Sequence, residues 1–118
     1  MTIESRNLDS PDEKRGFDKG ALNLVTVAGH TVGRATFEPG WRWSNDVKPI
    51  AGTDSCQVAH LGYVISGTMH VVMDDGAETD LGPGDAVVIP PGHDAWITSS
   101  EPCVMLDWAG SDNYAKPS

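Results

Sequence analysis

The chain of 118 residues is long enough for one domain with a hydrophobic core of its own. Its formal net charge of −9 at pH 7 argues against nucleic acid or an acidic membrane surface as a partner, since both repel a strongly acidic protein. The N-terminal stretch has no apolar segment, and no apolar run approaches the roughly 20 residues of a membrane span, so we expect a cytoplasmic protein without a signal peptide.

Short strand-like segments follow one another along most of the chain. Residues 1–20 are charged and lack periodicity, which predicts an N-terminal arm that is loose or lies across a neighbouring chain. Apolar and alternating runs predict strands over 21–27, 30–37, 41–43, 56–65, 69–73, 78–81, 86–89, 95–98 and 103–108, with a loop over 44–54 and a polar tail over 111–118. Closely spaced strands without a helical pattern are typical of a sandwich or barrel, so we expect one all-β domain over 21–110.

The stretch over 81–96, LGPGDAVVIPPGHDAW, is the most informative part of the sequence. A glycine-rich turn precedes the apolar run 86–89, which is typical of a buried strand. Pro90, Pro91 and Gly92 end that strand, and His93 follows directly. A histidine behind a rigid turn at the end of a strand is well placed to point into a cavity.

These residues resemble the second motif of the cupin superfamily, which has a glycine, five residues, P-x-G and a nearby histidine. Here the motif runs from Gly84 to His93. The YVISG segment ending at Gly67 is similar to the end of the first motif. The resemblance covers about residues 31 to 108 and is greatest to small stand-alone bacterial cupins with W-x-W-S and PPGHDAW. It implies a cupin-type jelly-roll β-barrel with one metal ion inside.

Metal-binding cupins use two histidines in an H-x-H pair, a Glu or Gln, and a histidine of the second motif. The sequence differs at each of these points. It contains no H-x-H, His60 stands where the family has its acidic ligand, and Ala95 stands where the second-motif histidine is usual. His93 lies two positions earlier. The resemblance therefore predicts the barrel more firmly than it predicts the ligands.

We expect the metal ligands to be His60, His93, Cys56 and Asp46, with Asp54 as an alternative carboxylate. Two neutral imidazoles with a sulfur or oxygen ligand suit a divalent transition metal, namely zinc, iron, nickel, copper or manganese. Cys56 and His60 are four residues apart, so they would face the same side of a regular strand. The alternatives are a polar pocket in which both histidines only form hydrogen bonds, and a Cys56 that is a nucleophile or part of the core.

The other cysteine, Cys103, lies in an apolar strand and is expected in the core, although the sequence leaves open whether it pairs with Cys56. Aromatic and cationic side chains near the two motifs predict a pocket for a small organic ligand. They are Trp41, Trp43, Tyr63, Trp96 and Arg42. The same aromatic residues would equally serve as core or as a dimer interface.

Three functions fit these residues. The first is a metal-dependent enzyme acting on a small organic substrate, as an oxygenase, isomerase or decarboxylase. The second is a module that binds or senses a small ligand without metal, and the third is a metal-free acid–base enzyme that uses a histidine as base. In each case we expect a homodimer, because two-sheet barrels pair through a remaining edge or share a terminal arm.

Overall fold

The structure, a computed structural model, describes residues 2–109 and 114–116. These residues contain nine strands and two one-turn helices. The strands are β1 (Glu13–Phe17), β2 (Gly20–Val27), β3 (His30–Phe37), β4 (His60–Ser66), β5 (Met69–Met73), β6 (Glu78–Leu81), β7 (Ala86–Ile89), β8 (His93–Ile97) and β9 (Cys103–Ala109). The helices are α1 (Trp43–Asp46) and α2 (Lys48–Ala51), and neither has the length to cross a membrane. The predicted all-β class is confirmed.

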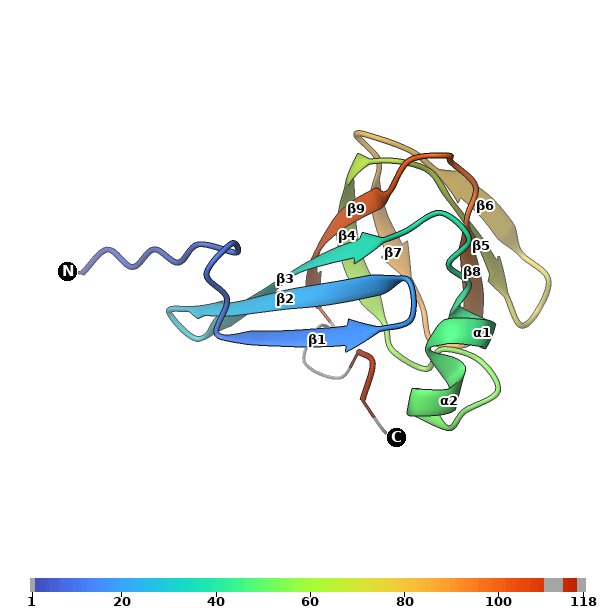
Figure 1. Cartoon of the computed structure of the whole chain (residues 1–118), viewed down its shortest axis with the longest axis horizontal. Helices are drawn as coiled ribbons and strands as arrows, with labels where there is room; N and C mark the ends of the chain where they lie inside the picture. Colours follow the sequence, from blue (N-terminus) through green and yellow to red (C-terminus); the bar gives the residue numbers. More distant parts are fainter. Residues whose placement is uncertain (1, 110–113, 117–118) are drawn as a thin grey trace.

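The strands form two antiparallel sheets (Figure 1). The larger sheet has the order β1-β2-β3-β9-β4-β7, and the smaller one has the order β6-β5-β8. β9 is the last strand in sequence, yet it lies between β3 and β4. This placement brings the C-terminal strand beside the start of β4, where His60 is located.

The core lies between the two sheets, because both contribute the inward side chains of their alternating strands. Val64 of β4 and Met105 of β9 belong to this core together with Met69 and Val71 of β5. In β8 the buried positions alternate from the first residue, His93, through Ala95 to Ile97. His93 therefore occupies an inward position, which opens into the same interior as the apolar core.

Part of the predicted N-terminal arm is instead a strand. Residues Glu13–Phe17 pair with β2 in register from Glu13 opposite Leu24 to Phe17 opposite Gly20. The charged sequence EKRGF hid this strand, because an edge strand exposed to solvent tolerates charged side chains. Residues 13–17 thus belong to the larger sheet.

The segment over 41–54 also differs from its prediction as a strand followed by a loop. Arg42 makes only an isolated bridge to Trp96, and Trp43 begins helix α1. The alternation of buried Trp41, exposed Arg42 and buried Trp43 is present, but it occurs at the entry to a helix rather than within a strand. A four-residue helix is too short to show a helical period in the sequence.

Candidate metal centre

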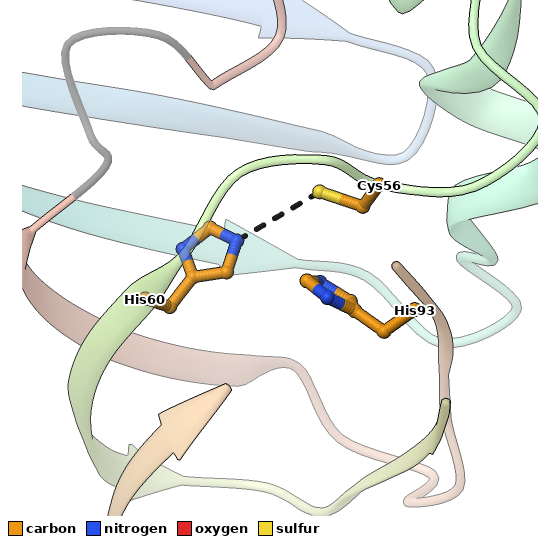
Figure 2. Close-up of side chains that lie close together, drawn as sticks. All are labelled: Cys56, His60 and His93. Atoms are coloured by element: carbon orange, nitrogen blue, oxygen red, sulfur yellow. Dashed lines mark hydrogen bonds between the residues drawn. The ribbon is translucent and has the colours of Figure 1, made fainter. Parts of the chain in front are cut away.

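Three of the four predicted ligands lie together. Ligand atoms of Cys56, His60 and His93 all lie within 4.8 Å of one another. Figure 2 shows the sulfur of Cys56 facing the ring of His60, with Sγ 3.9 Å from Nε2 and the ring of His93 beside them. The two imidazole centroids are 5.4 Å apart. Cys56 is 2% exposed and His93 4% exposed, so the group is shielded from bulk water.

The main chain holds Cys56 and His93 next to each other. The backbone N–H of Cys56 donates to the carbonyl of His93 at 2.7 Å, and those of Gly92 and His93 donate to the carbonyl of Cys56 at 2.7 and 3.2 Å. Gly92 has φ +91°, and a Cβ there would lie 2.9 Å from a carboxylate oxygen of Asp74, so the turn requires glycine. Cys56 forms an isolated bridge with His93 of β8, and the strand predicted over 56–65 begins only at His60.

Each histidine has its other ring nitrogen engaged. His60 Nδ1 lies 2.6 Å from a carboxylate oxygen of Asp107 on β9. His93 Nδ1 lies 2.9 Å from the carbonyl oxygen of Pro90, which can only accept, so Nδ1 carries a proton and Nε2 is the ring nitrogen that Pro90 does not engage. Histidines that bind metal ions almost always have such a partner on the far nitrogen, because it fixes both the tautomer and the ring orientation.

The charges of Cys56 and His60 depend on each other. Burial disfavours the thiolate, but hydrogen bonds from His60 and His93 outweigh burial and lower the pKa of Cys56 to about 6. Burial also disfavours the imidazolium, but the hydrogen bond to Asp107, followed by that to Cys56, raises the pKa of His60 to about 9. At neutral pH the metal-free protein therefore holds a thiolate beside an imidazolium, and the thiolate is the form of cysteine that binds metal.

Asp46, the fourth predicted ligand, does not join this group. One of its carboxylate oxygens accepts from the backbone N–H of Arg42 at 2.9 Å, and the other lies 3.4 Å from Nζ of Lys19. It thus stabilises the entry to α1. The alternative, Asp54, is exposed and lies 3.7 Å from the ammonium of Lys48. Neither carboxylate is near the three clustered side chains.

A cavity of about 50 Å³ adjoins the group, and His60 and His93 form part of its wall. Trp41 and Trp43 line it. The other three residues assigned to the pocket lie outside. Trp96 is stacked on the outer face against the guanidinium of Arg42, 4.4 Å away, and Tyr63 is 39% exposed on β4.

Residues 54–109 match the model of the Cupin domain family, and the two antiparallel sheets agree with that match.

Over nearly half of its length, the chain matches the cupin domain.

Several solved structures share the fold of the chain. A polyketide cyclase from Streptomyces resistomycificus has 18% identity and a TM-score of 0.63, with 93% of this chain and 80% of that chain covered. A protein of unknown function from Acidithiobacillus ferrooxidans has 20% identity and a TM-score of 0.61, with 89% and 92% covered. A sugar phosphate isomerase from Silicibacter pomeroyi has 20% identity and a TM-score of 0.61, with 88% and 73% covered. At these identities the likeness is one of fold, and no curated protein matches the sequence.

Two residues of the site escaped the sequence analysis. Asp107 shares the inward face of β9 with Cys103 and Met105, so alternation along CVMLDW was the signal that could have found it. Tyr114 falls within the predicted polar tail but is buried, with its ring 5.5 Å from that of His60. Its carbonyl accepts a hydrogen bond of 2.7 Å from Arg15. The rest of that tail, apart from residues 115–116, lies outside the described residues.

Proposed function

We propose that this protein holds a divalent transition metal through Cys56, His60 and His93 and acts there on a small organic substrate, as an oxygenase, isomerase or decarboxylase. The observation that supports this most is the pairing of both histidines through Nδ1, with Asp107 and with Pro90. Three protein ligands leave a coordination position for substrate or water. The metal would supply Lewis-acid catalysis or activate a bound oxygen species.

The donor set fits a metal ion of the softer kind. The 3.9 Å between Cys56 Sγ and His60 Nε2 is close to the separation of two ligands that each lie about 2.0 to 2.3 Å from one ion. A thiolate with two imidazoles suits zinc, copper, nickel or iron better than manganese, whose preferred ligands are oxygens. Within the chain, Asp107 orients His60, the Pro90 carbonyl orients His93, and the apolar cavity wall excludes water from the reacting atoms.

Elemental analysis of the protein purified without added metal tests this proposal. We expect about one transition metal ion per chain, and its loss in His60→Ala, because His60 provides one of three ligands. The matched control is His70→Ala. His70 also has a carboxylate on Nδ1, Asp80 at 2.7 Å, but it lies on the outside of β5. A parent protein that carries no metal and binds none on titration would exclude the proposal.

A ligand-binding module without metal is the second candidate. The observation in its favour is that Cys56, His60 and Asp107 already satisfy one another as thiolate, imidazolium and carboxylate. Such a group is stable without an ion, and the adjoining cavity could then bind a ligand directly. This candidate predicts metal-free protein whose melting temperature rises on addition of a small ligand.

We also propose that the protein is a homodimer formed through the outer face of β4, β7 and β9. Five of the large exposed hydrophobic side chains gather on these strands, and the pairing of Leu61 with Val88 places both on one face: Leu61, Tyr63, Ile65, Val88 and Trp108. The other outward positions of the three strands carry no charge, so two copies can meet there without opposing their acidic groups. Sedimentation should show a dimer that Val88→Asp dissociates, whereas Thr79→Asp on exposed β6 leaves it intact.

We also propose that the protein is cytoplasmic and has no nucleic-acid partner. Cys56 and Cys103 are both free thiols. A reducing compartment would keep Cys56 available as a ligand, since an oxidising one favours its conversion to a disulfide. The net charge of −9 opposes binding to nucleic acid.

A further inference from the structure

One residue that lines the cavity has a buried donor without an acceptor. The indole Nε1 of Trp41 is the one buried side-chain nitrogen or oxygen without a hydrogen-bond partner among the described residues. Trp41 is 2% exposed, so bulk water does not reach it. Buried polar groups are nearly always paired, and an exception calls for an acceptor that a ligand or a bound water supplies.

The same cavity joins Trp41 to the proposed metal ligands. Its wall contains Trp41, His60 and His93, and the remaining wall is mostly apolar, with Leu22 and Met69 among its side chains. A water molecule requires about 10 to 15 Å³ of such space, so a cavity of about 50 Å³ accommodates roughly three to five non-hydrogen atoms. An aromatic acid is too large for it.

Size and donors together select a chemical class. The ligand needs one oxygen to accept from the indole N–H of Trp41 and another atom to fill the open position at the metal ligands. A carboxylate is the smallest organic group that offers two acceptor oxygens, and one to three carbons bring it to the size of the cavity. A short alkyl chain then contacts the apolar wall.

We propose that the cavity binds a short aliphatic carboxylate of about three to five non-hydrogen atoms, one oxygen of which accepts a hydrogen bond from Trp41 Nε1. The proposal rests on the metal centre proposed above, which takes the second oxygen. It assigns Trp41 as a residue that determines which substrates bind.

Calorimetry on the protein loaded with zinc tests the class with formate, acetate, propionate, hexanoate and benzoate. We expect binding of the first three and none of the last two. Trp41→Phe keeps an aromatic ring and removes the donor, so acetate affinity should fall about tenfold while metal content is unchanged. The control, Trp96→Phe, removes an indole on the outer face and should leave acetate affinity as it is.

Nuclear magnetic resonance of the unaltered protein gives a second measurement that does not depend on the folding of the variant. The sequence has four Trp, and one indole N–H signal, assigned to Trp41 by its absence in Trp41→Phe or by elimination with the other three Trp→Phe variants, should move on addition of acetate. A metal-loaded protein that ignores all five acids, or binds acetate equally well without the indole donor, overturns the carboxylate site and leaves the metal centre standing. A protein without metal overturns the metal centre, and a Trp41-dependent acetate response in it still supports the carboxylate site. A bound water on Trp41 with no acetate response overturns the carboxylate site.

Discussion

The interaction of Asp107 with His60 provides the sharpest test of the metal centre. Asp107→Asn keeps the size of the side chain and removes the negative charge that lies 2.6 Å from His60 Nδ1. Loss of such a partner typically lowers metal affinity about 10- to 100-fold, because the histidine becomes a weaker and less well oriented ligand. The corresponding loss of binding free energy is about 1.4 to 2.7 kcal/mol.

The pH dependence of this effect follows from the pKa of His60. Burial opposes the proton on His60, but Asp107 and Cys56 outweigh burial and raise its pKa to about 9, so a metal ion must displace that proton at neutral pH. Asp107→Asn lowers the pKa and reduces this competition, which partly offsets the loss of affinity near pH 7. At pH 9 the offset is small. The ratio of parent to variant affinity should therefore increase as pH rises from 7 to 9.

Competition for zinc against a chromophoric chelator at pH 7, 8 and 9 measures that ratio. Asp80→Asn is the matched control, because it removes a carboxylate 2.7 Å from Nδ1 of the outward-facing His70 and should leave zinc affinity unchanged. Equal zinc affinities for the parent and Asp107→Asn at pH 9 would refute the assignment of Asp107 as the residue that orients a metal ligand.

Two further predictions concern stability. In the metal-free protein the lowered pKa of Cys56 makes the free energy of unfolding rise with pH above about 6. The raised pKa of His60 makes the free energy of unfolding fall between pH 6.5, the ordinary pKa of histidine, and about pH 9. The two slopes therefore oppose each other. Cys56→Ser removes the rising part, and urea unfolding should show stability falling above pH 6.5 in the variant but not in the parent; identical slopes would speak against the thiolate–imidazolium pair. Gly67→Ala should cost about 3 kcal/mol or more, since φ is +75° and a Cβ would lie 2.5 Å from backbone atoms of Pro102 and Cys103. Gly76→Ala, with φ +93° and open space around it, should cost only about 1 kcal/mol, and similar losses in both variants would contradict this packing argument.

Sequence patterns located most strands because turn residues separate short apolar runs along the chain. The strand predicted over 69–73 matches β5, and its alternation places Met69 and Val71 inside. The two helices were missed because each has four residues, and β1 was missed because an edge strand can be charged. These errors concern elements whose formation depends on neighbours more than on their own residues.

The candidate site was only partly accessible to sequence reasoning. His93 could be placed because a local turn, Pro90 to Gly92, ends the strand before it. Cys56 and His60 were paired for an incorrect reason, since they do not share a strand. Asp107 reaches His60 through the pairing of β4 with β9, and that pairing joins residues more than 40 positions apart, at Gly62 and Asp107. No local pattern encodes a register between such distant segments.

The main-chain bridge between Cys56 and His93 fixes the position of the proposed metal site independently of which metal the site prefers. Its hydrogen bonds use only backbone atoms, so the spacing of the two positions does not depend on the side chains they carry. Exchange of Cys56 for histidine would give three imidazoles on the same frame, a harder set of donors. Natural or engineered relatives could thus change the preferred metal ion by a substitution at position 56 while the backbone stays unaltered.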